Sequence, residues 1–510
     1  MAKTDPQEAL RNRKAPIDMT PDEFRKTGYQ VVDRIAEFLG SLSRRPVTPG
    51  ESPEKIRALL GNGSIPLQGA APDHLFKEAA DLLFDHSLFN GHPRFWGYIT
   101  ASPSPVGMLG DLLAAAINPN VAAWVLSPMA TEIEAQAIRW IAELIGYPVS
   151  CGGLMVSGGN MANFVGFLAG RTAKAPWNIR EQGLGGGAQQ PLVYVSKATH
   201  TWIEKAADLF GLGAKAIRWV ETGADQQMSI EALEKQIAAD RAGGYLPFMV
   251  VGAAGTVGVG AIDPLPEIAA ICREQNLWFH VDGAYGAPAA ALPEAPAGLR
   301  GLAAADSIAL DPHKWLYNPL EAGCVLVRDP QALVNTFSFH PEYYNFDNTR
   351  GDQAALNYYE FGPQNSRGFR ALKVWLGLRH VGKEGYIQMM REDIALAEEL
   401  YKLVDSHTEL QALTHNLSIT TFRYIPSGLA SGDPATEEYL NKLNLELLNR
   451  LQAGGEAFVS NAVIDGKYLL RACIVNFRTT LNDVEALPEI VVRLGRELDA
   501  QMRGEFLEVG

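Results

Sequence analysis

The stretch Asp311-Pro312-His313-Lys314-Trp315 decides the fold when it is taken together with His280-Val281-Asp282-Gly283-Ala284-Tyr285. An apolar run precedes the polar residues in each segment, 307–310 in the first and 277–281 in the second. Such a run predicts a buried strand that ends in a loop. Because the ligand of an open α/β sheet lies at the carboxyl ends of its strands, we expect the aspartate and the lysine to face one site.

The same alternation continues outward from these two strands over residues 105–372. Near-continuous apolar runs that are separated by helical patterns predict an α/β fold, with a mostly parallel sheet covered by helices on both faces. We expect residues 105–372 to form one large domain. The expected strands are 192–195, 216–220, 248–253, 277–281, 307–310 and 323–327, and the expected helices are 129–145, 160–172, 201–211, 229–241 and 264–275.

Two further segments flank this domain. Residues 1–104 are expected to form a helical layer, in which Thr20-Pro21-Asp22-Glu23 has the residues of a helix start. This layer has too few apolar residues for a core of its own, so we expect it to pack on a second subunit. Residues 373–510 are expected to form a small α+β domain, with helices at roughly 384–405, 436–453 and from 482 onward, and strands at 418–424, 457–464 and 468–477.

The composition excludes several classes of protein. With 47% hydrophobic and 20% charged residues, the chain has an ordinary globular composition. Its net charge of −14 argues against binding to nucleic acid or to an anionic membrane. The four cysteines lie far apart without metal-ligand spacing, so we expect no metal site, and we expect reduced cysteines in a cytoplasmic protein. The N-terminus does not resemble a targeting peptide, and no apolar run is long enough to span a bilayer.

Lys314 and Asp282 carry the most specific chemistry in the sequence. A lysine at a strand end can form a Schiff base with a carbonyl compound, and desolvation or a neighbouring cation would activate it. A carboxylate can keep a pyridine nitrogen protonated, which makes the ring an electron sink. The two together are what pyridoxal phosphate requires of a protein. Taken singly, however, Asp282 also fits a turn or capping residue and Lys314 a surface lysine.

Three weaker signals accompany this pair. Ser157-Gly158-Gly159-Asn160 precedes a helical pattern, and free amides at a helix N-terminus attract an anion, although the same residues also fit a plain helix cap. His200 follows the run 192–195, so it could stack on a flat cofactor or be an ordinary loop residue. The small residues of Gly252-Ala253-Ala254-Gly255-Thr256 would allow a ring to approach closely.

In combination these motifs resemble a known family. The segments PHKW, HVDGAYG and SGGNMAN, His200 at its strand end, and the segment 366–373 (SRGFRALK) resemble the group II pyridoxal-phosphate-dependent amino-acid decarboxylases, in particular the aromatic-L-amino-acid and histidine decarboxylases. The resemblance runs over nearly the whole chain. It implies the PLP-dependent transferase fold of the aspartate aminotransferase type I, with a mostly parallel seven-stranded sheet in a PLP-binding domain. It also implies a homodimer with shared active sites, in which residues 1–104 clasp the partner.

The resemblance further implies roles for individual residues. Lys314 would form the Schiff base with the cofactor, and Asp282 would pair with the pyridine nitrogen. His200 would stack on one face of the ring, with Ala284 on the other face. The other cofactor contacts that it implies are Gly158, Gly159 and Asn160 at the phosphate, with Asp311 and His313 nearby, Thr256 near the ring hydroxyl, and Asn365 and Ser366 from the other subunit.

The expected reaction depends on Tyr343, which lies in a segment similar to a mobile catalytic loop of the family. The tyrosine of that loop is thought to return a proton after CO2 leaves, and aldehyde-forming relatives tend to carry phenylalanine there. Because Tyr343 and His200 are both present, we expect decarboxylation of an L-amino acid, aromatic or related, to its amine. The alternatives are an aldehyde synthase or transaminase, a decarboxylase of glutamate, aspartate or diaminobutyrate, and a catalytically silent homologue.

The expected substrate pocket is less aromatic than that of the nearest relatives. Its candidate wall consists of Tyr98, Ile99, Ala122 and Trp124, each of which also fits ordinary core packing. Ile99 and Ala122 stand where those relatives have aromatic residues. Asp311 is a second departure, because the family usually has asparagine at this position.

Overall fold

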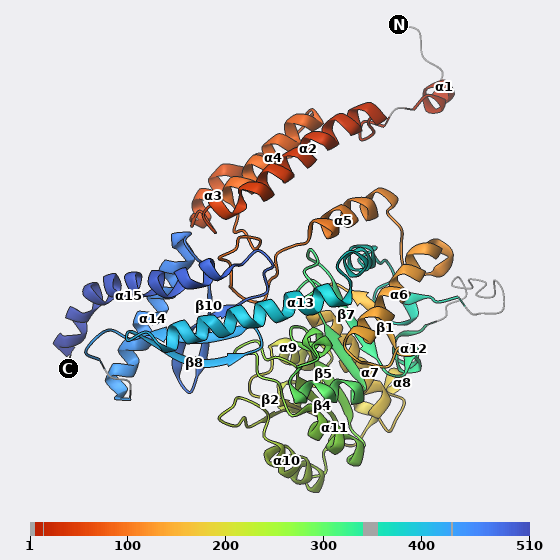
Figure 1. Ribbon diagram of the computed structural model, residues 1–510. Helices are drawn as coiled ribbons and strands as arrows, with labels where there is room; N and C mark the ends of the chain where they lie inside the picture. The colour runs from red at the N-terminus through yellow and green to blue at the C-terminus, as the bar shows by residue number, and fades with distance from the viewer. Residues whose placement is uncertain (1–5, 14, 340–354, 430–431, 510) are drawn as a thin grey trace.

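The computed structural model describes residues 6–13, 15–339, 355–429 and 432–509. A seven-stranded sheet lies at the centre of its larger part (Figure 1), in the order β1-β7-β6-β5-β4-β2-β3. β7 is antiparallel to both of its neighbours, and the other neighbouring pairs are parallel. The strands are β1 Gly152–Val156, β2 Pro191–Ser196, β3 Ile217–Val220, β4 Leu246–Ala253, β5 Trp278–Asp282, β6 Ser307–Leu310 and β7 Gly323–Val327.

Helices lie on both sides of this sheet (Figure 1). Helix α7 packs across β4 to β7, and α11 packs against β4 and β5. These observations confirm the predicted α/β class and the mostly parallel sheet. The helices of this part are α5 Pro105–Ile117, α6 Pro128–Leu144, α7 Gly159–Lys174, α8 Ile179–Gln182, α9 Trp202–Leu209, α10 Ile230–Ala242, α11 Leu265–Glu274 and α12 Pro330–Phe337.

The strand predictions succeeded where branched apolar residues cluster. β6 and β7 have the predicted bounds, and β2 to β5 differ from the prediction by one or two residues at their ends. β1 was not predicted, because its sequence opens with two glycines, which have low strand propensity. The structure explains one of them, since a Cβ at Gly153 would lie 2.4 Å from the carbonyl oxygen of Val325 on β7.

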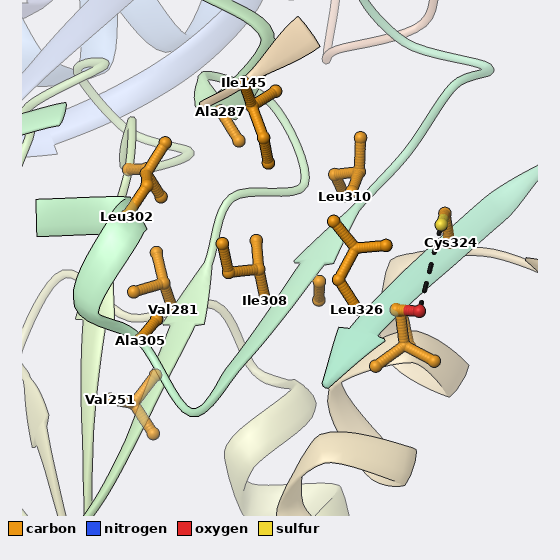
Figure 2. Close-up of a cluster of buried hydrophobic side chains, with 14 of the residues drawn as sticks. Ile145, Val251, Val281, Ala287, Leu302, Ala305, Ile308, Leu310, Cys324 and Leu326 are labelled. Carbon is orange, nitrogen blue, oxygen red and sulfur yellow. Dashed lines mark hydrogen bonds between the residues drawn. The ribbon is translucent and has the colours of Figure 1, made fainter. Parts of the chain in front are cut away.

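The core of the sheet holds the site-bearing loops in place. Figure 2 shows side chains of neighbouring strands meeting there, with Val251, Val281 and Ile308 among them. All three are almost fully buried, and full burial of such a side chain stabilises the fold by about 1.5–3 kcal/mol. The expectation that cysteines are core residues is confirmed for Cys272, Cys324 and Cys473, while Cys151 is half-buried.

The C-terminal part contains a second, antiparallel sheet with the order β10-β11-β9-β8. Its strands are β8 Leu410–Asn416, β9 Ile419–Tyr424, β10 Ser460–Ile464 and β11 Lys467–Cys473, and its helices are α13 Ala371–Asp405, α14 Pro434–Gly454 and α15 Leu481–Val509. α13 is interrupted at Gly382, whose φ of 69° is left-handed, so the predicted helix 384–405 is its second half. β8 was not predicted.

The N-terminal helices α2 and α4 form a pair that projects from the rest of the molecule (Figure 1). They pack on each other through Phe38 and Phe84, whose stacked rings lie 4.4 Å apart. The predicted helix start is confirmed, because Thr20 and Glu23 form a capping box. Within the described residues, no helix is both long and apolar enough to cross a membrane. The N-terminal helices are α1 Pro6–Arg11, α2 Pro21–Ser41, α3 Pro53–Leu60 and α4 Pro72–His86.

Candidate active site

One cavity of about 580 Å³, called the active-site cavity below, opens at the carboxyl ends of β1, β2, β4, β5 and β6. β10 and β11 of the second sheet contribute another wall. The structure brings most of the candidate residues together here, although they are spread over more than two hundred positions of the sequence. Those that line the cavity are Tyr98, Ile99, Gly158, Gly159, Asn160, His200, Thr256, Asp282, Ala284, Asp311, His313 and Lys314.

The turn between β1 and α7 lies at one end of the cavity and contains two residues without side chains, Gly158 and Gly159. Gly158 has a φ of 151°, which favours glycine. A Cβ at Gly159 would lie 2.7 Å from Oδ2 of Asp311 and 3.3 Å from the Cβ of Ala284. The first backbone amides of α7 have no partner within the helix and carry the positive end of its dipole. This end of the cavity is therefore suited to an anion such as a phosphate.

Lys314 brings a primary amine into the cavity from the loop after β6. Its Nζ lies 3.0 Å from Oδ2 of Asp311. The Asp311 side chain is 2% exposed, and its other oxygen, Oδ1, has no hydrogen-bond partner among the described residues. His313 also lies near this carboxylate, with Nε2 3.7 Å from the same Oδ2. Burial lowers the pKa of His313, while the Asp311 carboxylate raises it and so opposes that shift.

Asp282 ends β5 with both carboxylate oxygens bound. Trp202, the first residue of α9, donates its indole Nε1–H to Oδ2 at 2.8 Å, and the backbone N–H of Ala284 donates to Oδ1 at 3.2 Å. The Trp202 side chain is fully buried, so this donor cannot exchange with water. The carboxylate is thus held in one orientation. Sequence analysis did not single out Trp202, because nothing in the sequence shows which way its ring points.

His280 lies on the same strand as Asp282, two residues earlier, and links that strand to its neighbours. Its Nε2 lies 2.8 Å from Oδ1 of Asn163 on α7, and its Nδ1 lies 2.7 Å from Oγ of Ser307 on β6. Complete burial lowers the pKa of His280 to about 4, so the ring is neutral near pH 7. The imidazole therefore ties three elements together without adding a charge near Asp282.

His200 lies at the mouth of the cavity, in the loop that leads from β2 to α9. Its ring is exposed, and its Nδ1 accepts a hydrogen bond of 3.3 Å from the backbone N–H of Trp202. Thr256 lies deeper in the cavity wall, and its hydroxyl accepts a hydrogen bond of 3.1 Å from the backbone of Ala261. His200 and Thr256 therefore both line the cavity.

Arg471 on β11 supplies a buried cation that sequence analysis missed. It is 2% exposed and lines the cavity, with one terminal nitrogen donating to the carbonyl of Tyr98 (3.0 Å) and to Oγ of Ser460 (2.9 Å). Within the part of the chain that the structure describes, its Nε and second terminal nitrogen have no hydrogen-bond partner. Burial lowers the pKa of Arg471 from its usual high value. The signal in the sequence was a charge within an otherwise apolar strand, Tyr468-Leu469-Leu470-Arg471-Ala472-Cys473.

Four candidate residues lie outside the cavity of the single chain. Ala122 is buried against Ala123 and Tyr359, and Trp124 donates its indole N–H to Glu132 at 2.9 Å. Asn365 and Ser366 are exposed. The two loops that carry them lie together, because Arg367 accepts a hydrogen bond from Val121 N–H (2.9 Å) and donates one to its carbonyl (2.6 Å). Tyr343 lies outside the described residues.

The chain is similar to known proteins over nearly its whole length. The family model of the pyridoxal-dependent decarboxylase conserved domain matches residues 53–425. An aromatic-L-amino-acid decarboxylase from Bacillus atrophaeus is 35% identical over 483 residues, which cover 94% of this chain and 97% of the relative.

Two solved structures of similar plant proteins have the same fold. A crystal structure of Oryza sativa TDC with PLP and tryptamine has a TM-score of 0.87 and 28% identity, and the match covers 95% of this chain and 99% of that one. The tryptophan decarboxylase of Catharanthus roseus, solved in complex with L-tryptophan, has a TM-score of 0.84 and 27% identity, with 95% and 100% covered.

Proposed function

Because the chain belongs to the pyridoxal-dependent decarboxylase family, we propose that its active-site cavity converts an aromatic L-amino acid to the corresponding amine and CO2. The protein is a PLP-dependent amino-acid decarboxylase, a lyase, as its relatives are. The observation that carries the proposal is the convergence of Lys314, Asp282 and the N-terminus of α7 in one cavity. The aromatic class is supported by the names of the relatives and by Tyr98 and Ile99 in the cavity wall.

The residues of the cavity fit pyridoxal phosphate. The aldehyde of this cofactor needs a primary amine, its ring nitrogen needs a carboxylate, and its phosphate needs hydrogen-bond donors in a space free of side chains. We propose that Lys314, Asp282 and residues 158–160 meet these needs in that order. A side chain at Gly159 would collide with the Asp311 carboxylate, which explains why this turn, next to the first amides of α7, has a glycine there. When bound, the cofactor supplies an electron sink for the electron pair that departing CO2 leaves behind.

The protein side of the reaction rests on fixed charges. We propose that Asp282 holds a proton at the ring nitrogen, since its two oxygens are already oriented by Trp202 and Ala284. His200 and the methyl group of Ala284 would lie on the two faces of the ring, and Thr256 near its hydroxyl. None of these groups has to reorganise during the reaction, which is how preorganised sites lower a barrier.

We propose that Arg471 receives the carboxylate of the amino acid. Its free N–H groups are buried, and a charge-assisted hydrogen bond in such surroundings is stronger than one in water. Tyr98 is held beside it in an uncommon left-handed conformation, with a φ of 54°, by hydrogen bonds of its backbone to Ser460 and Arg471. Tyr98 and Ile99 would then cover the substrate and exclude water.

We propose a homodimer in which each subunit completes the cavity of the other. The loops that carry Ala122, Trp124, Asn365 and Ser366 lie side by side away from the chain's own cavity, as a contribution to a partner would require. Apolar side chains are also exposed at Val125, Leu126 and Met129, which follow Trp124 in the chain, and on α5, α2 and α4. Helices α2 and α4 share few contacts with the rest of the chain, so a partner surface would bury them.

We propose that residues 1–104, 105–372 and 373–510, the three parts predicted from the sequence, have different roles in this dimer. The first part would dimerise, the second would bind the cofactor, and the third would supply the wall that carries Arg471. The separate buried cluster of the C-terminal part supports the third division. We also propose a cytoplasmic location, which the four free cysteines support.

A panel of L-amino acids tests the proposed substrate class. Tyrosine, tryptophan, phenylalanine, DOPA, histidine, glutamate, aspartate and 2,4-diaminobutyrate are each offered to the purified protein with pyridoxal phosphate, and release of CO2 and amine is measured. We expect turnover of at least one aromatic member that exceeds turnover of the three acidic or basic aliphatic members. Preferred turnover of glutamate or aspartate would contradict the aromatic assignment.

The Tyr343→Phe variant tests whether the product is an amine. If Tyr343 returns the proton at the carbon that loses CO2, its loss should divert the product from amine toward aldehyde and ammonia. The measurement is the ratio of amine to aldehyde, with hydrogen peroxide and ammonia assayed alongside CO2. An unchanged amine yield would show that this tyrosine is dispensable. His200 stays in place, so any change belongs to the loop.

The Trp202→Phe variant tests the orientation of Asp282. It removes the indole donor but keeps a buried ring, so Asp282 loses a charge-assisted hydrogen bond. Such a bond is worth about 1.5–3 kcal/mol, and we expect kcat to fall by about 10- to 100-fold with KM changed less than about threefold. We also expect the absorption spectrum of the bound cofactor to change with pH over a different range than in the wild-type protein.

The matched control is Trp278→Phe. Trp278 is another buried tryptophan whose indole donates a hydrogen bond, but it donates to Ser307 at 2.8 Å, at the opposite end of β5. We expect this variant to keep the wild-type kcat and cofactor spectrum. Its loss of thermal stability should be similar to that of Trp202→Phe. Equal losses of kcat in the two variants would show that Trp202 acts only through packing.

A further inference from the structure

Asp311 places a negative charge at the end of the cavity that is suited to an anion. The residue follows β6, and its carboxylate lies against the first residue of α7, where a Cβ on Gly159 would be 2.7 Å from Oδ2. The side chain is 2% exposed, so water does not screen it. The proposed function puts the cofactor phosphate beside the same helix terminus, and the present inference rests on that proposal.

Among the described residues, Lys314 is the nearest cation to this carboxylate. Its Nζ is 3.0 Å from Oδ2, whereas Oδ1 is buried without any hydrogen-bond partner. Once the amine of Lys314 is bonded to the cofactor, it is no longer free to pair with Asp311. The carboxylate would then face a phosphate with one oxygen unsatisfied, and two buried like charges without a counter-ion are strongly unfavourable.

The other titratable groups near Asp311 do not replace Lys314. His313 is the nearest, at 3.7 Å from Oδ2, but burial lowers its pKa and favours the neutral ring. Its Nδ1 is already engaged with the backbone of Ala322. The remaining groups on the neighbouring elements are His200 after β2, Asp282 on β5, the buried thiol of Cys324 on β7, and Lys373 on α13, which is paired with Asp111.

We propose that Asp311 couples binding of the cofactor phosphate to uptake of one proton from solvent. The proton is held on the Asp311 carboxyl group, whose Oδ2 lies beside Gly159 and would become an O–H donor toward a phosphate oxygen once Lys314 is bonded to the cofactor. No covalent bond forms or breaks in this step. The arrangement makes retention of the cofactor sensitive to pH through its phosphate and not through its aldehyde.

Pyridoxal phosphate and pyridoxal, which lacks the phosphate, separate the two effects. Dissociation constants of both are measured for wild-type protein and Asp311→Asn between about pH 7 and 8.5, where a phosphate ester is close to dianionic. Absorbance reports the bond to Lys314 in each case. The ratio of the two affinities cancels the contribution of the bond to Lys314, because both ligands bond to the same amine.

For wild-type protein we expect the preference for pyridoxal phosphate over pyridoxal to fall about tenfold per pH unit, as uptake of one proton requires. Asparagine is neutral and has its own N–H donors, so Asp311→Asn should bind pyridoxal phosphate at least about tenfold more tightly at pH 8, with a preference that no longer depends on pH. Pyridoxal also takes Lys314 away from Asp311, so the comparison uses the preference for pyridoxal phosphate over pyridoxal within each protein, and bonding of pyridoxal to both proteins reports correct folding.

The control variant is Asp306→Asn. Asp306 is a half-buried aspartate that accepts a hydrogen bond from Phe279 N–H and does not line the cavity. It should behave as wild type. Equal preferences and equal pH slopes in wild type and Asp311→Asn would overturn the inference while leaving the cofactor assignment intact. Failure of pyridoxal and pyridoxal phosphate to bond to Lys314 at all would contradict the proposed function, and the inference with it.

Discussion

The Lys314→Ala variant is expected to lose its bound cofactor spectrum and its activity together. Lys314 is the primary amine within the described cavity, and the proposed attachment of the cofactor needs that nucleophile. We expect turnover to fall at least about a thousandfold, which corresponds to about 4 kcal/mol in the barrier. Borohydride should fix the cofactor onto a peptide that contains Lys314 in the wild-type protein and onto no peptide in the variant.

Lys197→Ala is the matched control for this experiment. Lys197 also follows a strand of the main sheet, but it is exposed and pairs with Glu221 at 2.8 Å outside the cavity. The control should keep the cofactor spectrum, the labelled peptide and the turnover of wild type. Retention of both spectrum and turnover in Lys314→Ala would refute the assignment of the cofactor site.

The Arg471→Met variant is expected to lose substrate affinity while keeping the cofactor. Methionine matches the buried stem of arginine but removes the charge and all of its donors. The lost charge-assisted hydrogen bonds are worth about 1.5–3 kcal/mol, so kcat/KM should fall by about 100-fold. Because Arg471 reaches the cavity from β11, away from residues 158–160, the loss should appear mainly in KM, with an unchanged cofactor spectrum.

Two further variants show whether the charge of Arg471 is responsible. Arg471→Lys keeps a cation and should recover part of the affinity. Arg171→Met removes another partly buried arginine with an unpartnered Nε, on α7 and outside the cavity, and should leave kcat/KM within about twofold of wild type. If Arg471→Met lost the cofactor spectrum instead, the residue would have to support the cofactor and not the substrate.

The parts of the fold that could be predicted are those with a local pattern. Runs of buried branched residues gave β6 and β7 their correct bounds, and the cap at Thr20 predicted the start of α2. Two strands, β1 and β8, were not predicted, for different reasons. β1 begins with two glycines, of which Gly153 is required by close contact with β7, and such residues give no strand signal. β8 mixes polar and apolar residues because it is an edge strand with mostly half-buried side chains.

The chemistry of the site divides in the same way. The residue types at the strand ends, above all Lys314 and Asp282, follow from the order of strands and loops along the chain. A strand that is buried on both faces can present reactive groups to a ligand only where it ends. These positions can therefore be recognised from the sequence alone. The amine, the carboxylate and the glycine turn could therefore be chosen before any coordinates were known.

Packing alone decided how these groups are oriented and what surrounds them. Trp202 reaches Asp282, and Arg471 reaches the cavity, because helices and sheets that are distant in sequence are pressed together by burial of their apolar faces. The direction of a side chain and its remaining partners depend on those contacts and leave no local pattern. The same holds for the unpaired oxygen of Asp311, since its isolation is a property of its neighbours and not of the segment that carries it.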